Sequence, residues 1–348
     1  MKTPFVSRPR PSLGLVILCL AASVATSRAV LAQGSPPSPA PSLAQGSQPP
    51  SDAAEPPAYT MVEEVEVIGR LPGPALWRVS TPTSQLWIVG MVGQMPKGFS
   101  WDNRRVVVAL DGARELILPP GILGGVSNNE LVVDPNRVFH LPPGATVRGD
   151  LPAPLAARLE AVVNAIGQKP DQYDHWRPVL SALMLSADGP SHYGYAPQIL
   201  SIAGLAKTRH VKVRPLANYA KGGDLLRGLA AAPPAAAQAC MTLAVQNLER
   251  LPADGPRRAA AWATGDLKTL RAMGDSRDMG PCFDAVPGTA TMRDRAAADW
   301  ARELGKVLVT PGKTVVAVNL DDLTRKGGLL DQLKAQGLDV IGPDYNGL

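Results

Sequence analysis

The sequence predicts an α/β fold, with a mixed β-sheet core, flanking helices and a helix-rich C-terminal half. Short apolar runs bounded by glycine or proline alternate with segments whose apolar residues recur at helical spacing. The run Leu86–Val89 stops at Gly90 and a short turn follows, which is typical of a buried strand that delivers a loop to the edge of a sheet. The later part of the chain is rich in alanine within long helical patterns.

The first 32 residues predict a secretory signal peptide. Lys2, Arg8 and Arg10 form a basic start, and the apolar stretch 13–24 is too short to span a membrane comfortably. Val-Leu-Ala at 30–32 is a suitable small-residue cleavage site. We therefore expect a periplasmic or secreted protein.

Residues 33–58 predict a flexible linker, and residues 59–348 one α/β domain. The linker is rich in Pro, Ser, Ala and Gln and has almost no bulky apolar residues, so it cannot bury enough surface to offset the entropy of ordering. No segment after the signal is long and apolar enough to span a bilayer.

The charge balance argues against a nucleic-acid partner. The whole chain has a net charge of +5, but the signal peptide contains four basic residues and no acidic ones. The chain without the signal has 31 basic and 30 acidic residues, a net charge of +1. Phosphate-loop and dinucleotide-binding motifs are also missing from the sequence.

The elements of the N-terminal half can be placed in order. Alternating Glu and Val predict a half-exposed strand, the runs around a Thr-Pro-Thr-Ser turn predict a hairpin, and helix and strand patterns follow up to a proline stop. These segments are Glu63–Gly69 (strand), Leu76–Val79 and Leu86–Val89 (hairpin), Asn103–Leu110 (helix), Glu115–Leu118 (strand, stopped by Pro119) and Gly124–Asn129 (turn or flap).

The remaining elements are mostly helical, with strands near the end. Two apolar stripes at helical spacing face the core, and Gly337 fits a left-handed helix cap. The expected elements are stripes at 155–166 and 176–184, helices at Ile199–Lys207, Cys240–Leu251, Arg257–Met273, Ala290–Leu308 and Leu329–Gln336, and strands at Val211–Leu216, Thr314–Val318 and Asp339–Ile341.

Two cysteines remain after the signal peptide, Cys240 and Cys282. In an oxidising compartment they predict one disulfide, worth about 2–4 kcal/mol in the chain-entropy picture. The alternative is two buried free thiols.

The segment Leu86–Gly98 resembles a signature of the TraB/GumN family, which includes the TIKI-like metalloproteases. The family pattern is approximately L-L-G-T-I-H-x-L-P-x-G, and Gly90, Pro96 and Gly98 are in register with it. Gly93 occupies the position of the family histidine.

A second family element, approximately V-A-V-G-A-x-H-L, resembles residues 316–323, where Asp322 occupies the histidine position. Pro119 stands where a family acid follows a strand, and 216–218 read Leu-Ala-Asn where the family has an L-E-T context. Arg293–Asp294 matches a family pair at the start of the last long helix.

The resemblance implies that the family's metal site has lost its ligands. A catalytic zinc needs about three protein ligands, and neither Gly93 nor Pro119 has a ligand atom in its side chain. Only Asp322 could still bind a metal, so we expect no metal, no cofactor and no catalytic residues. The alternative is a relocated site around Asp322 and Arg293 with His175 or His192.

The polar residues left near the vacated position are the candidate cleft residues: Gln94, Lys97, Arg293, Asp294 and Asp322. The leading hypothesis is an exported, catalytically inactive binding or accessory protein with an envelope or polysaccharide-related ligand. One alternative is a divergent metal-dependent hydrolase or protease with a relocated site. Another is a structural partner protein that uses its alanine-rich helices.

Overall fold

The computed structural model describes residues 73–120, 137–169, 171–217, 227–274, 279–286 and 290–345. All of them belong to the second of two units of the chain, Glu66–Leu348. The predicted signal peptide, the linker, the strand Glu63–Gly69 and the turn Gly124–Asn129 lie outside the described residues.

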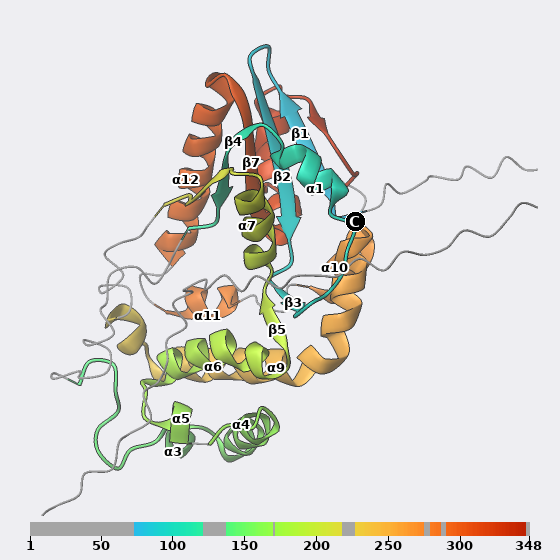
Figure 1. Cartoon of the computed structure of the whole chain (residues 1–348). Coiled ribbons are helices and arrows are strands. Elements are labelled where there is room, and N and C mark those ends of the chain that lie inside the picture. Colours follow the sequence, from blue (N-terminus) through green and yellow to red (C-terminus); the bar gives the residue numbers. More distant parts are fainter. Residues whose placement is uncertain are drawn as a thin grey trace, which may run out of the picture. The chain divides into compact units, whose positions relative to one another are not determined.

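The described part confirms the α/β prediction, with a mixed six-stranded sheet and flanking helices (Figure 1). Neighbouring strands pair in parallel from β6 to β2, whereas β1 is antiparallel to β2 and β8 is antiparallel to β1. The spatial order is β6 (Lys212–Pro215), β4 (Ala113–Leu118), β7 (Gly312–Asn319), β2 (Ser84–Met91), β1 (Leu76–Ser80) and β8 (Val340–Ile341).

The predicted N-terminal hairpin is present as β1 and β2. Leu76 pairs with Val89 and Ser80 with Gln85. The turn is tightened by a hydrogen bond from Thr81 N to Ser84 O at 2.9 Å, and the Ser84 hydroxyl donates to Leu308 O at 2.7 Å. The short polar side chains of the turn therefore both close the hairpin and attach it to helix α12 (Ala290–Val309).

Each face of the sheet has its own apolar core, because successive side chains of a strand point to opposite faces. One core joins strand residues such as Met91 and Val315 to helices α1 (Arg104–Leu110) and α7 (Gln198–Thr208). The other joins Ile88 and Val316 to α12 and α14 (Leu329–Ala335). Both faces are thus covered, as expected for a largely parallel sheet.

A third core lies in a helical cluster, which we define as helices α4 (Ala153–Ala165), α6 (Pro178–His192), α9 (Pro234–Ala263) and α11 (Gly280–Ala285). Both α6 and α9 begin with proline, whose missing N–H costs nothing in a first turn. The predicted disulfide Cys240–Cys282 is confirmed and joins α9 to α11. Shorter elements complete the described chain: α3 (Val147–Asp150), α5 (Asp171–Asp174), α10 (Leu267–Met273), α13 (Leu320–Thr324), and a two-stranded sheet of β3 (Gln94–Pro96) and β5 (Tyr195–Pro197).

The prediction of separate helices at Cys240–Leu251 and Arg257–Met273 is wrong. Residues Pro234–Ala263 form a single helix that includes Pro252 and Pro256, and α10 begins only at Leu267. Each proline removes one backbone donor and bends or breaks a helix. In α9 the helix continues through both prolines. Figure 1 shows α9 running beside α6 and then turning toward α10.

Within the described residues, none of the helices combines the length and the apolar character that a bilayer crossing requires.

Candidate functional site

The four parallel strands end at a common edge, which we call the carboxyl edge. Met91 at the end of β2 lies opposite Asn319 at the end of β7, and Leu118 at the end of β4 lies opposite Pro215 of β6. The parallel register therefore brings together loops that are far apart in the sequence. Loops at this edge are where α/β proteins usually place their ligands.

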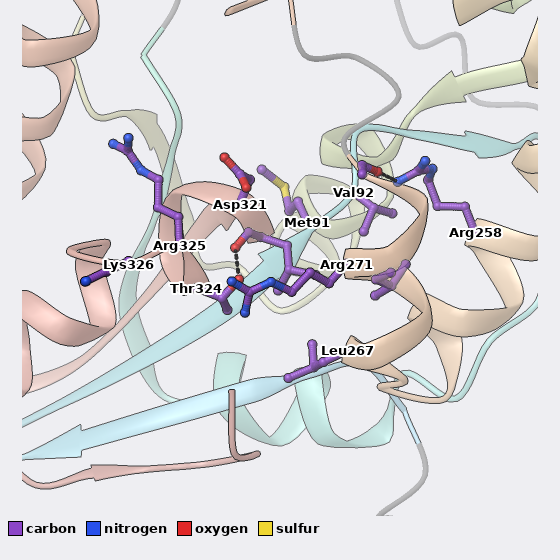
Figure 2. Close-up of a pocket in the computed structure, with 12 residues that line it drawn as sticks. Met91, Val92, Arg258, Leu267, Arg271, Asp321, Thr324, Arg325 and Lys326 are labelled. Carbon is purple, nitrogen blue, oxygen red and sulfur yellow. Dashed lines mark hydrogen bonds between the residues drawn. The ribbon is translucent and has the colours of Figure 1, made fainter. Parts of the chain in front are cut away.

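A pocket of about 130 Å³ opens at the carboxyl edge (Figure 2). Its wall combines the end of β2, the bent helix α9, helix α10, and α13 with the residues after it. The lining residues are Met91, Val92, Arg258, Leu267, Leu270, Arg271, Gly274, Leu320, Asp321, Thr324, Arg325 and Lys326.

Gly90 allows α13 to approach β2 closely, and its backbone carbonyl binds α9. A Cβ atom on Gly90 would lie 2.8 Å from Leu320 Cδ1 and 3.2 Å from the Trp77 ring. The carbonyl of Gly90 accepts a hydrogen bond of 2.7 Å from Trp262 Nε1 of α9. The strand end, α13 and α9 thus meet at one glycine, and a side chain at this position would require Leu320 of α13 to shift.

The turn after β2 is held by its own glycine and by Gln198. Gly93 has φ +92°, a conformation that residues with side chains rarely adopt. Its carbonyl accepts from Gln198 N at 2.8 Å, and Val92 N donates to Gln198 Oε1 at 2.7 Å. A histidine at position 93 would be strained in this backbone conformation.

The pocket wall is strongly basic. Arg258 is only 4 % exposed, and its guanidinium donates to the carbonyls of Gly274 and Met273 at the end of α10. A cation is favourable there because the carbonyl end of a helix is partly negative. Arg325 and Lys326 are exposed, and Arg325 Nε lies 4.0 Å from Asp322 Oδ1.

The predicted cleft residues are divided between different places. Gln94 is buried in β3, and no other group of the described residues bonds its Oε1 atom. Lys97 Nζ donates to Ser191 O of α6 at 3.3 Å, and neither residue lines the pocket. Asp322 lies on α13, directly after the pocket residue Asp321, with a side chain that is 47 % exposed. The pair Arg293 and Asp294 lies in α12, with side chains outside the described part.

The candidate histidines do not lie at the carboxyl edge. His192 ends α6 of the helical cluster, and His175 follows α5 beside it. His192 Nε2 is 3.2 Å from Asp188 Oδ2, and Tyr173 donates to the same oxygen at 2.7 Å. Burial and this hydrogen bond raise the pKa of the Tyr173 phenol well above its usual range. The carbonyl of His175 accepts from Leu141 N. Each of these contacts supports the local helix arrangement.

Across the described residues, no three His, Cys, Asp or Glu side chains are grouped so that they could hold a metal ion.

The basic wall was missed by the sequence reasoning. Arg325 and Lys326 follow the second family element within four residues of Asp322, and that proximity was the available signal. Arg258 and Arg271 lie in alanine-rich helical segments and have no such signal, because their position depends on the bend of α9.

A comparison with protein-family models gives a match to the TraB/PrgY/gumN family over residues 75–341. No curated protein and no solved structure matches the chain. The matched region begins with β1 and ends with β8, so it covers the whole sheet and the pocket.

Proposed function

We propose that this chain, which belongs to the TraB/PrgY/gumN family, is a ligand-binding or accessory protein of the cell envelope that carries out no metal-dependent hydrolysis. The pocket at the carboxyl edge is its binding site. The ligand would be a component of the envelope or related to its polysaccharides, a setting that the family resemblance suggests.

The observation that carries this proposal is the identity of the residues on the converging loops. The resemblance expects ligands at positions 93, 119 and 322, and the parallel register brings the loops after β2, β4 and β7 to one edge. Gly93 and Pro119 have no ligand atom in their side chains. A single carboxylate, Asp322, does not hold a transition metal against water, because such sites need about three protein ligands.

An open pocket favours a binding role over a purely structural one, for which we would expect a filled cleft and an exposed apolar patch. The large apolar residues most exposed in the described part are scattered over four elements: Val108, Leu200, Val309 and Ile341. Isolated residues of this kind are normal on protein surfaces.

Export is supported by two features. The first 32 residues have the charge and hydropathy pattern of a signal peptide, and both cysteines of the Cys240–Cys282 bridge are fully buried. Structural disulfides persist in oxidising compartments such as the periplasm. Intact-mass measurement of the protein from periplasmic extract should give a chain that begins at Gln33; a chain that still begins at Met1 would contradict export by this signal.

The test of the central proposal is the metal content of the protein, purified without chelators and measured by elemental mass spectrometry. We expect less than about a tenth of an equivalent, unchanged by added zinc, manganese or cobalt. Near-stoichiometric metal that is lost in Asp322→Ala would overturn the proposal. It would favour the divergent hydrolase, and protease and hydrolase assays would follow.

A further inference from the structure

The pocket has more positive than negative charge in its wall. Its lining contains one anion, Asp321, and four cations: Arg258, Arg271, Arg325 and Lys326. Asp322 partly offsets Arg325, but it does not line the pocket. Cations held around one small concave site raise its potential and attract an anion.

The cations come from opposite sides of the pocket. Arg258 and Arg271 belong to α9 and α10, whereas Arg325 and Lys326 follow α13. Figure 2 shows Arg258 on one side and Arg325 and Lys326 on the other, with Arg271 extending from α10 in the direction of α13. A guanidinium offers a planar pair of donors that matches a carboxylate or phosphate group. An anion between the two sides would reduce the repulsion between them.

The same pocket also has an apolar part of its lining. Its apolar members are Met91, Val92, Leu267, Leu270 and Leu320. An inorganic anion would leave this surface without a partner, whereas an organic anion could bury an aliphatic group against it. The combination of apolar and cationic lining residues therefore selects a ligand that is apolar at one end and anionic at the other.

The volume limits the size of the group that enters. At about 130 Å³ the pocket is well below the roughly 300–1,000 Å³ of sites that enclose a drug-sized ligand. Only an end group fits, and the remainder of a longer ligand would extend into solvent over the exposed Arg325 and Lys326.

We propose that the pocket binds a carboxylate attached to a short aliphatic group. The aliphatic group lies on Leu267, Leu270 and Leu320, and the carboxylate is bound by Arg271 together with the cations that follow α13. This inference rests on the proposed binding function and specifies its ligand class. A free short-chain fatty acid and the C-terminal residue of a peptide both present this chemistry.

The test is calorimetric titration of the purified protein with hexanoate and with N-acetyl-leucine. Hexanol is the neutral control, and inorganic phosphate is the anion without an aliphatic group. We expect at least one of the two carboxylates to bind about tenfold or more tightly than both controls, with affinity that falls as salt is raised. Preference for hexanoate would indicate a fatty acid, and preference for N-acetyl-leucine a peptide C-terminus.

Variants localise the binding. Arg271→Gln combined with Lys326→Gln should weaken the better carboxylate about tenfold or more, because two charge-assisted contacts are removed. Arg250→Gln is the matched control, since Arg250 is an exposed cation of α9 that does not line the pocket. It should leave the affinity unchanged.

Three results would overturn the inference: neither carboxylate binds, hexanol or phosphate binds as tightly as the carboxylates, or the Arg250 variant loses as much affinity as the double variant. Such a failure is distinct from failure of the proposed function. The absence of metal would still support a binding protein with another ligand, whereas stoichiometric metal would overturn the binding function itself.

Discussion

The parallel sheet and the helical cluster contribute to the pocket in different ways. The sheet places loops: the paired ends of β2 and β7 bring Met91 beside Asn319 across more than half of the chain. The helical cluster, through the bend of α9, adds Arg258 to the wall above them. The difference teaches that the position of the pocket is set by the sheet, whereas part of its positive charge is set by the helical cluster. The loops are held in place by the paired strands, whereas the position of Arg258 depends on the bend of α9.

The largest effect should come from breaking the contact that joins the two regions. Trp262 of α9 is 1 % exposed, and its indole N–H donates to Gly90 O. It packs edge-on against Trp101, with the ring centroids 4.7 Å apart. Trp262→Ala should lower the free energy of unfolding by about 4–6 kcal/mol, through the cavity and the lost hydrogen bond. Denaturant unfolding measures this.

Trp262→Phe is the matched control for that variant. It keeps most of the ring volume and removes the donor to Gly90 O, so it should cost about 1–3 kcal/mol. Equal losses in both variants would show that the hydrogen bond, and not the packing, holds α9 on the sheet.

The second effect tests whether the helical cluster can loosen while the sheet stays intact. Cys240 and Cys282 are 42 residues apart, and a bridge of this span contributes about 4 kcal/mol in the chain-entropy picture. The double variant Cys240→Ala, Cys282→Ala should lose about this much stability. Hydrogen exchange should show the lost protection in α9 and α11. An equal loss of protection in β2 and β7 would contradict the separation of the two regions.

A third effect sharpens the comparison at the bend of α9. A Cβ atom on Gly255 would lie 2.5 Å from Tyr195 Cζ and still closer to its Oη, so Gly255→Ala should lower the free energy of unfolding by about 1–3 kcal/mol through overpacking. Gly204 of α7 is the matched control, because nothing lies within 4 Å of its added Cβ. Gly204→Ala should stabilise by about 0.5–1 kcal/mol. Urea midpoints of the two variants should therefore shift in opposite directions; shifts of the same sign would refute the close approach of β5 to α9.

The smallest effect concerns Arg214 of β6, which pairs with Glu115 of β4 and also with Glu303 of α12. Arg214 Nε of β6 donates to Glu115 Oε2 of β4 at 2.6 Å, and this bond lowers the pKa of Glu115 below its ordinary value of 4.5. The unfolded chain binds the proton more readily, so the contribution is complete above pH 4.5 and is lost as the pH falls through the lowered pKa.

The contribution of this pair should be about 1 kcal/mol or less, because both side chains are partly solvated. In Arg214→Met, the decline of stability on acidification should be shallower. Unfolding titrations at several values between about pH 3 and pH 6 compare the two proteins. Identical pH profiles would mean that Arg214 does not lower the pKa of Glu115 and that the pair does not contribute to stability.

Local patterns predicted the sheet better than the site. The apolar runs ending at Val89 and Val318 correctly gave β2 and β7, and Gly337 has the expected positive φ of 76°. The strands β3 and β5 were missed because three residues are too few for an alternation to be visible. The continuity of α9 through Pro252 and Pro256 was missed because the sequence alone does not show that packing on both sides of these prolines holds the helix together.

For the site, the family motifs pointed to the loops after β2 and β7, but not to the helices α9 and α10 that complete the pocket. The cleft residues named from the sequence, Gln94, Lys97, Arg293, Asp294 and Asp322, stay predictions. Gln94, Lys97 and Asp322 do not line the pocket, and the side chains of Arg293 and Asp294 lie outside the described part. Proximity along the chain pointed to the loops, whereas Arg258 and Arg271 come close only through tertiary packing.

The central place of β7 in the sheet also determines when the sheet can be completed during synthesis of the chain. β7 lies between β4 and β2, yet it is the last of the four parallel strands to leave the ribosome. Until about residue 319 has emerged, β2 and β4 each have an edge whose backbone groups lack their final partner. Open strand edges favour pairing with other chains, so the interval between synthesis of β4 and synthesis of β7 is when this protein most needs protection from aggregation.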